Sequence, residues 1–233
     1  MSWQAGPCRR WLLHRAHLLR GDWHMHTVFT DGRSTVHEYC EAARAQGLQL
    51  IALTEHVRRE LSYDFGAFVE QVDAARCDFP DLTILRGCEA KVLNQDGDLD
   101  VTEDVLAHCD IVLAAFHSFQ DSSRYVTAVL NMLENPRVDV WAHPTLYCRK
   151  QGVVMSPVEI EKIIGRCLDQ AVLLEMNGRY GLPDGQFLEA VEGAGLTRVW
   201  GSDAHHACEL GRRWTGRKLV EPGPQSAGRE LTW

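Results

Sequence analysis

The chain has 233 residues and carries 24 Lys and Arg against 32 Asp and Glu, which gives a formal net charge of −8. Apolar residues make up 45% and charged residues 24%, the balance of a globular protein, so the composition excludes a mainly disordered chain. The length predicts a single domain, and the acidic excess argues against an extended nucleic-acid surface, which shows as an excess of basic residues.

Residues 1–20 precede the first strand signal, and we expect them to form an N-terminal extension. Their apolar stretch, residues 11–19, is interrupted by His14, Arg15 and His17, whereas a signal peptide has an unbroken apolar core. A short surface helix is the favoured prediction, and an amphipathic leader is the alternative.

Seven short apolar runs follow and alternate with longer amphipathic segments. They cover residues 21–27, 48–54, 82–93, 111–116, 138–143, 172–177 and 198–203. Such alternation predicts parallel strands joined by crossover helices, and therefore an α/β sheet or barrel. We assign residues 21–214 to this domain.

Helix start signals lie between these runs. Thr35 precedes Glu38 and an alanine-rich stretch, and Ser156 with Pro157 precedes the amphipathic residues 158–168. Each gap between the predicted strands leaves room for one helix.

Residues 215–233 contain two prolines and three glycines with little periodicity. Glycine and proline interrupt helices and strands, so this segment is predicted to be a loosely docked C-terminal tail.

Almost every predicted strand ends in a polar side chain that can bind a metal ion. These residues are His24 and His26, Glu55 and His56, Glu89, His117, His143, Asn177, and Asp203 with His205. The carboxyl ends of barrel strands meet at one mouth, so these side chains are expected to face one another. His24 and His26 are two residues apart and share one face of a strand. Imidazoles and carboxylates without thiolates are typical of a catalytic site for Zn, Mn or Fe.

The motifs that carry these residues resemble those of the polymerase and histidinol phosphatase (PHP) superfamily. They are Asp22-Trp-His24-Met-His26-Thr27, Thr30-Asp31-Gly32, Thr54-Glu55-His56, Gly87-Cys-Glu89, Phe116-His117-Ser118, Ala142-His143-Pro144 and Gly201-Ser-Asp203-Ala-His205. They occur in the order of the family and span residues 21 to about 214. The resemblance implies a distorted (β/α)7 TIM-like barrel with up to three divalent metal ions at the carboxyl ends of the strands.

The resemblance also implies how the ligands are shared among the metals. His24, His26, Glu89 and Asp203 would hold the first ion, Glu89 with His117 and His143 the second, and Asp31, His56 and His205 the third. Glu89, His117, Asp203 and His205 would be the catalytic residues. The chain departs from the family at Glu55, where the usual residue is Asp, and Glu55 is therefore left out of the ligand set.

Three residues are predicted to bind the substrate. Arg149 follows His143, and Asn177 and Arg179 lie at the end of the sixth strand, where histidinol phosphatases of the superfamily place phosphate-binding arginines. A planar guanidinium suits bidentate contact with a phosphate. The alternative for the two arginines is a solvated loop charge.

These observations predict a metal-dependent phosphomonoesterase that hydrolyses a small phosphorylated metabolite with metal-activated water. The first alternative is a phosphodiesterase or 3′ exonuclease, and the second, from another class, is a non-catalytic scaffold stabilised by metal. A metal-dependent amidohydrolase or lactonase is a smaller rival, because the same activated water can attack carbon.

Eight cysteines are scattered along the chain without a CxxC pair, which is typical of free thiols in a reducing compartment and predicts a cytoplasmic protein. The apolar runs are far too short to cross a bilayer, so no membrane partner is expected.

Overall fold

The computed structural model describes residues 9–18 and 20–222. Seven parallel strands form one sheet in chain order: β1 (Gly21–Met25), β2 (Leu50–Val57), β3 (Thr83–Lys91), β4 (Ile111–Ala115), β5 (Val140–Trp141), β6 (Leu173–Asn177) and β7 (Arg198–Gly201). Each of them falls within or overlaps one of the seven apolar runs. The predicted α/β fold with seven parallel strands is therefore confirmed.

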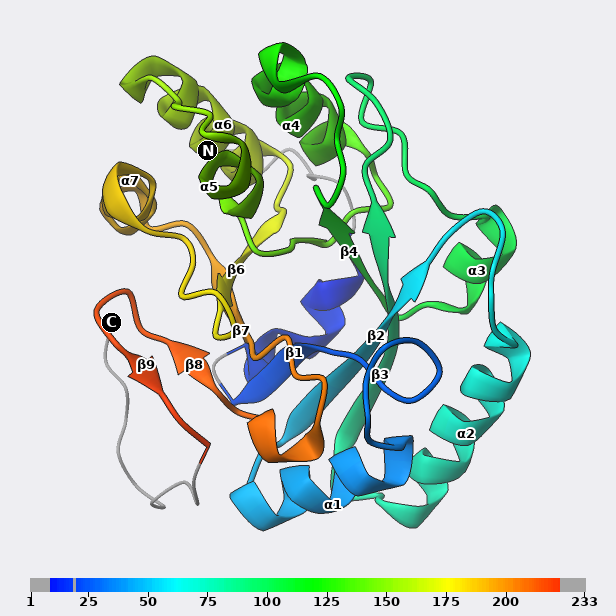
Figure 1. Ribbon diagram of the computed structural model, residues 1–233. Coiled ribbons are helices and arrows are strands. Elements are labelled where there is room, and N and C mark those ends of the chain that lie inside the picture. The colour runs from blue at the N-terminus through cyan, green and yellow to red at the C-terminus, as the bar shows by residue number, and fades with distance from the viewer. Residues whose placement is uncertain (1–8, 19, 223–233) are drawn as a thin grey trace, which may run out of the picture.

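The sheet curls until its first strand meets the segment after its last (Figure 1). The backbone N–H of Asp203 donates to the carbonyl of His24 at 2.9 Å, and the N–H of His26 donates to the carbonyl of Ala204 at 2.9 Å. The buried carboxylate of Asp22 accepts from the N–H of Ser202 at 2.9 Å. These bonds nearly close the ring, as expected for a distorted TIM-like barrel.

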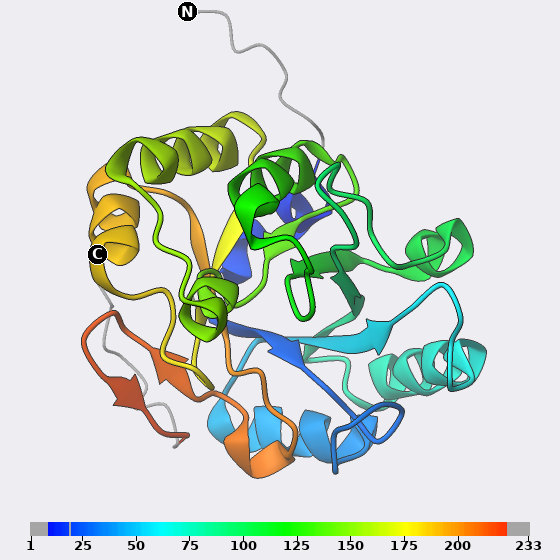
Figure 2. The same cartoon turned by 45° about the horizontal axis from the view of Figure 1, so that its top comes forward.

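Helices surround the ring of strands, as the tilted view in Figure 2 shows. They are α1 (Val36–Gln46), α2 (Phe65–Asp78), α3 (Glu103–His108), α4 (Tyr125–Glu134), α5 (Leu146–Gln151), α6 (Pro157–Asp169) and α7 (Gly185–Ala194). Both predicted start signals are capping boxes, formed by Thr35 with Glu38 and by Ser156 with Glu159.

Two apolar cores follow from the alternation of side chains along the strands. Strand β4 is apolar at every position because its two faces are both buried. Ile111, Leu113 and Ala115 pack inside the barrel, and Val112 and Ala114 pack under the surrounding helices. The strand ends are thereby held on a rigid frame.

The amino-terminal end of the barrel is covered by the chain that precedes β1. A 3-10 helix, η1 (Arg10–His17), lies across it and appears in dark blue within the ring in Figure 1. The buried guanidinium of Arg9 donates to the carbonyls of Val138 at 2.5 Å and Gln170 at 2.8 Å. Trp11 is buried with the inner core. The short surface helix predicted here is present as η1: Leu12, Leu13, Arg15 and Ala16 are exposed, while Trp11 packs against the barrel. Residues 1–8 of the predicted extension lie outside the described residues.

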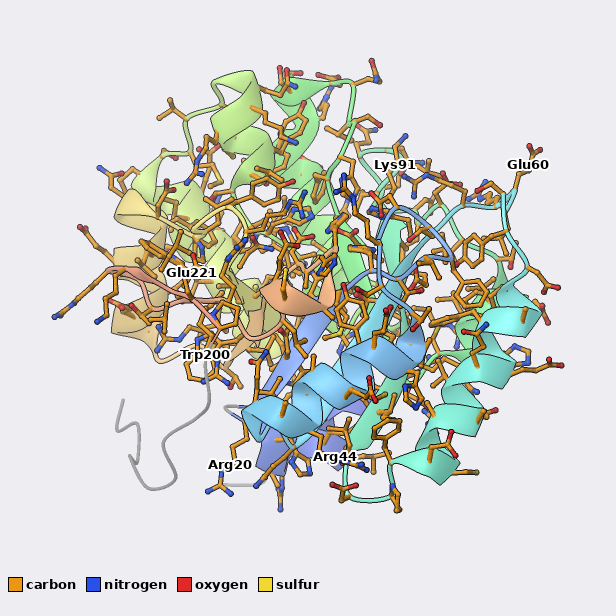
Figure 3. The ribbon with its side chains drawn as sticks, turned by 60° about the horizontal axis from the view of Figure 1, so that its bottom comes forward. Arg20, Arg44, Glu60, Lys91, Trp200 and Glu221 are labelled. Carbon is orange, nitrogen blue, oxygen red and sulfur yellow. The ribbon has the colours of Figure 1, made fainter. Side chains whose placement is uncertain are left out.

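The two ends of the barrel can be followed in Figure 3. Arg20 and Arg44 lie near the end covered by η1. Glu60, which follows β2, and Lys91, the last residue of β3, lie at the opposite end, the barrel mouth.

Smaller elements complete the described chain. Two short 3-10 helices, η2 (Ser122–Arg124) and η3 (Ala207–Glu209), lie in loops, and β8 (Arg213–Trp214) pairs with β9 (Leu219–Val220) as an antiparallel hairpin. The hairpin includes the start of the predicted tail, whose residues 223–233 lie outside the described residues. Within the described residues, no helix has both the length and the apolar character to cross a membrane.

Candidate metal centre

Glu89 lies at the middle of the barrel mouth, where β3 presents its carboxylate to several imidazoles. The side chain is almost wholly buried. Its Oε1 lies 2.7 Å from Nε2 of His143 and 3.1 Å from Nε2 of His117. The structure therefore brings together the three residues expected at the second metal.

The residues expected at the first metal form a cluster around the other oxygen of Glu89, which we call the first cluster; Glu89, His117 and His143 are the second cluster. Nε2 of His24 lies 3.1 Å from Nε2 of His26, and the two atoms lie 3.7 and 3.6 Å from Glu89 Oε2. Nε2 of His26 is also 3.7 Å from Oδ1 of Asp203. Two ligand atoms that each lie ~2.1 Å from a tetrahedral ion are ~3.4 Å apart. The spacing of these four side chains fits one divalent ion.

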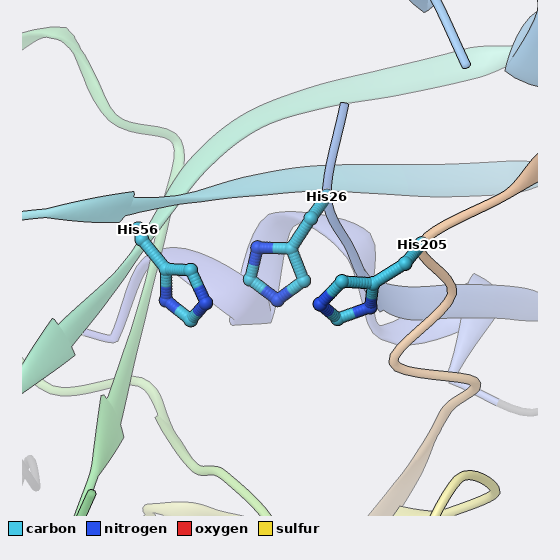
Figure 4. Close-up of side chains that lie close together, drawn as sticks. All are labelled: His26, His56 and His205. Carbon is cyan, nitrogen blue, oxygen red and sulfur yellow. The ribbon is translucent and has the colours of Figure 1, made fainter. Parts of the chain in front are cut away.

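The third cluster, of Asp31, His56 and His205, adjoins the first and lies nearer to solvent. Oδ2 of Asp31 lies 3.5 Å from Nε2 of His56 and 3.3 Å from Nε2 of His205. The ring of His26 lies between those of His56 and His205, with centroids 4.2 and 4.7 Å away (Figure 4). All nine residues expected as ligands thus lie in three adjoining clusters.

The hydrogen bonding of these side chains is incomplete in a way that fits metal ions. Nδ1 of His56, Nε2 of His117 and Oε2 of Glu89 are buried without a hydrogen-bond partner. Nδ1 of His56 is only 2.9 Å from Oε2 of Glu89, yet the two atoms are not oriented as donor and acceptor. Buried polar atoms are costly without partners. Their lone pairs converge on shared space, as ligands of a cation do.

The electrostatics differ among the imidazoles of the centre: Glu89 is favoured as a carboxylate and His26 as a neutral ring, whereas neighbouring carboxylates outweigh burial and raise the pKa of His24, of His205 and of His56, the last to about 10. Burial alone would raise the pKa of Glu89, but the surrounding imidazoles, His117 and His24 foremost, hold it well below its usual range. Burial and the neighbouring rings of His56 and His24 lower the pKa of His26 well below its ordinary value. A neutral imidazole is the form that binds a metal.

The backbone is strained at two of these positions. His143 has a φ of 29° and Asp203 a φ of 54°. Residues other than glycine rarely adopt positive φ, and such conformations concentrate at functional sites where the surrounding structure enforces them.

Glu55, the position where the chain departs from the family pattern, supports a loop. Its buried carboxylate accepts hydrogen bonds from the N–H of Thr27 at 2.9 Å and the hydroxyl of Thr30 at 2.5 Å. These bonds fix the turn that carries Asp31. Gly32 continues the turn so close to β1 that a Cβ there would lie 2.1 Å from the carbonyl oxygen of His26.

The three residues expected to bind substrate lie in different surroundings. The guanidinium of Arg179 lies at the centre, 2.8 Å from Nδ1 of His205. Arg149 is on helix α5 rather than in a loop, and it pairs with Asp184 at 2.6 Å. Asn177 is buried and donates to the carboxylate of Asp203 at 3.3 Å.

A hollow of about 430 Å³ opens beside the third cluster. Its lining includes Phe29, Asp31, His56, Arg58, Leu61 and Tyr63. The cationic side chain of Arg58, apolar side chains and the proposed ligands Asp31 and His56 therefore line one cavity at the barrel mouth. The sequence did not single out Arg58, because an arginine two residues after a predicted ligand looks like an ordinary loop charge.

Glu175 is a further residue of the centre that sequence reasoning missed. It lies within β6, is buried, and is 2.7 Å from Nδ1 of His24. The available signal was a glutamate inside an otherwise apolar parallel strand, because a buried charge requires a partner.

Comparison with known proteins identifies the family. Residues 22–153 match the family described as the PHP domain. The chain belongs to the PHP domain family. The family expected from the motifs is thereby confirmed, and so is the enzyme class, a PHP metal-dependent phosphoesterase.

Several PHP relatives have curated names. A probable phosphatase of Shewanella piezotolerans is 34% identical over 204 residues, which cover 82% of this chain and 79% of the relative. A probable phosphatase of Acetivibrio thermocellus is 31% identical over 219 residues, covering 86% and 85% of the two chains. The DNA polymerase/3′-5′ exonuclease PolX of Bacillus subtilis is 33% identical over 221 residues, 88% of this chain. The chain spans only 37% of the length of PolX.

Solved structures share the PHP fold at lower identity. The histidinol phosphate phosphatase HisK of Lactococcus lactis, complexed with Zn, L-histidinol and phosphate, has a TM-score of 0.62 and 19% identity, covering 81% of this chain and 88% of that one. The structure of a protein named as the putative histidinol phosphatase HisK of Listeria monocytogenes has a TM-score of 0.68 and 17% identity. The match covers 82% of this chain and 97% of that one.

Proposed function

We propose that this PHP protein hydrolyses phosphate monoesters of a small metabolite and uses two or three divalent ions, Zn, Mn or Fe. The observation that carries the proposal is the convergence of unpartnered nitrogen and oxygen atoms around Glu89. Curated relatives named as probable phosphatases support the same reaction.

The proposed ligands divide among the three clusters. His24, His26, Glu89 and Asp203 would hold one ion, Glu89, His117 and His143 a second, and Asp31, His56 and His205 a third. Bound divalent ions supply charge neutralisation at the phosphoryl oxygens and activate the attacking water. The protein contributes the fixed geometry, because every proposed ligand except Asp31 lies on a barrel strand or within four residues of its end, and Asp31 lies on the turn that Glu55 holds.

The phosphate would be held by Arg179, whose guanidinium lies beside His205. Asn177 would hold the carboxylate of Asp203 in place through the hydrogen bond that its amide donates. Arg149 would contribute less to phosphate binding, because its charge is already paired with Asp184. We propose that the organic part of the substrate occupies the hollow beside Arg58, whose volume suits a small molecule.

The proposal is tested by phosphate release from a panel of monoesters. The panel contains sugar, nucleotide and amino-alcohol phosphates, and includes L-histidinol phosphate because the L. lactis relative binds L-histidinol and phosphate. Metal-loaded wild type should release phosphate from at least one of them, and His24→Ala should not. Equal phosphate release by the two proteins, or none from any ester, would refute the proposed function.

A phosphodiesterase or 3′ exonuclease is the second candidate, and the match to PolX favours it. The net charge of −8 argues against binding of a long nucleic acid, which is itself an anion. Comparing p-nitrophenyl phosphate with bis(p-nitrophenyl) phosphate and a single-stranded oligonucleotide separates the two candidates, since a monoesterase prefers the first substrate.

We also propose a cytoplasmic location and a catalytic domain at residues 21–214, flanked by residues 1–20 and 215–233. The cysteines of the described residues support the location, because all seven are free thiols and five of them are buried.

A further inference from the structure

The carboxylate of Glu175 touches two of the strand ends that build the proposed metal centre. Its Oε1 lies 2.7 Å from Nδ1 of His24, and its Oε2 accepts a hydrogen bond from the backbone N–H of His143. The side chains of Glu175 and His24 are each about 1% exposed. A single buried residue on β6 therefore contacts β1 and the turn after β5.

A carboxylate at position 175 can accept from both of its partners. A backbone N–H is always a donor, and Nδ1 of His24 donates when the ring is the tautomer that leaves Nε2 with its lone pair. That Nε2 lies 3.1 Å from Nε2 of His26, in the first cluster. Only an ionised carboxylate offers two oxygens that both accept, whereas the amide of Gln offers one acceptor and one donor group.

The sequence leaves room for this carboxylate at Gly201, the last residue of β7. A Cβ at Gly201 would lie 1.9 Å from Oε1 of Glu175 and 2.8 Å from Cβ of His24. Any side chain at this position would displace the carboxylate from His24. Residues of three strands, β1, β6 and β7, thus fix the position of the Glu175 carboxylate.

We propose that Glu175 is a positioning residue that fixes the tautomer and orientation of His24 and the turn of His143 for metal binding. The inference rests on the proposed function, since it assumes that these histidines bind metal. A carboxylate that accepts from the second nitrogen of a metal-binding histidine orients the ring and raises its basicity. Loss of such a partner typically weakens metal affinity by ~10–100-fold.

The test compares Glu175→Gln with a matched control at the opposite end of the barrel. Asp139 is also a buried carboxylate with two donors, the backbone N–H groups of Arg10 at 3.0 Å and Val112 at 3.1 Å. Asp139→Asn therefore removes the same chemistry without touching the centre. The measurement is Zn²⁺ affinity by competition with a chromophoric chelator, together with unfolding of each metal-free protein.

We expect Glu175→Gln to bind Zn²⁺ about 10–100-fold more weakly than wild type. Asp139→Asn should stay within about twofold of wild type, and unfolding of the metal-free proteins shows how much stability each variant has lost. Equal Zn²⁺ affinity of Glu175→Gln and wild type, or an equal loss in the two variants, would overturn the inference.

A second measurement uses the wild type, so it stands even if Glu175→Gln does not fold. In the Zn²⁺-loaded protein, ¹⁵N-resolved NMR of the imidazoles should show a proton on Nδ1 of His24, assigned by its loss in His24→Gln. A His24 ring protonated on Nε2 would overturn the inference. The two proposals fail differently: wild type that binds no Zn²⁺ refutes the metal centre itself, whereas unchanged affinity in Glu175→Gln refutes only the role of Glu175.

Discussion

Oε1 of Glu89 lies 2.7 Å from Nε2 of His143, while its Oε2 faces the first cluster. One carboxylate therefore serves two clusters, and its loss should damage both. We expect Glu89→Gln to lower metal content and to reduce kcat/KM by more than ~100-fold, since removal of an outer partner alone costs up to that factor. Metal analysis and steady-state kinetics measure the two effects. Glu189→Gln, on the exposed face of α7, is the control and should behave as wild type.

Metal removal should lower both activity and stability. Ligands that bind the folded state alone stabilise it by about 2.7 kcal/mol at a hundredfold excess over Kd, which corresponds to a Tm change of about 5–10 °C for a chain of this size. Thermal unfolding before and after chelation, followed by addition of Zn²⁺ or Mn²⁺, measures it. A fall in Tm in a protein that hydrolyses no ester with any metal would favour the scaffold alternative.

Substitution of Arg179 should lower kcat/KM without lowering the metal content of the protein. A charge-assisted hydrogen bond contributes ~1.5–3 kcal/mol, so Arg179→Ala should lower kcat/KM by about 10–100-fold. Arg149→Ala is the matched comparison and should have a smaller effect, because Arg149 is paired with Asp184 at the surface. Equal kinetic losses in the two variants would contradict the proposed division of roles.

Shortening Glu55 should affect the third cluster selectively. In Glu55→Asp the carboxylate is one methylene shorter and cannot reach both Thr27 and Thr30, so the turn that carries Asp31 loosens. We expect loss of the most weakly bound metal, with the other sites retained, as measured by metal stoichiometry during dialysis. Glu60→Asp shortens an exposed carboxylate of the following loop and should leave the stoichiometry unchanged. Full occupancy in Glu55→Asp would show that the loop does not depend on Glu55.

The stability of the barrel should depend on pH through Asp139. Burial raises the pKa of its carboxyl to about 6, although the backbone hydrogen bonds from Val112 and Arg10 and the charges of Arg10 and Arg9 act to lower it. Its pKa in the unfolded chain is ~4, so protonation favours the folded state. This stabilisation is complete below pH ~4 and is lost as the pH rises through about 6.

Asp139→Asn cannot titrate, which makes it the reference for that effect. Between pH 4 and 7 the wild type should lose stability relative to the variant by on the order of 2–3 kcal/mol. Urea unfolding of both proteins in chelator, at several pH values, measures the difference. A difference that is constant with pH would exclude Asp139 as the titrating group.

The strands and the proposed ligands could be predicted because each apolar run ends in a polar residue, and parallel strands deliver their ends to one place. Glu175 could not be predicted to contact His24, because the two are 151 residues apart and the contact depends on the barrel closing. The local pattern around Arg149 gave its charge but not its partner, since Asp184 comes from a different segment.

Arg9 and η1, which cover the amino-terminal end of the barrel, show the same limit. A basic segment interrupted by histidines favours a surface helix when it is considered alone. The helix is largely exposed, as predicted, but the burial of Arg9 just before it could not be predicted, because its guanidinium donates to carbonyl groups that only the folded barrel brings together, among them those of Val138 and Gln170.

The bond between Asp22 and Ser202 joins residues that are 180 positions apart. During synthesis, His24 and His26 leave the ribosome long before Asp203. The first cluster therefore lacks its fourth proposed ligand, Asp203, until β7 and the residues after it have been made. An incomplete chain therefore presents scattered imidazoles that hold an ion poorly. We expect metal binding to follow closure of the barrel.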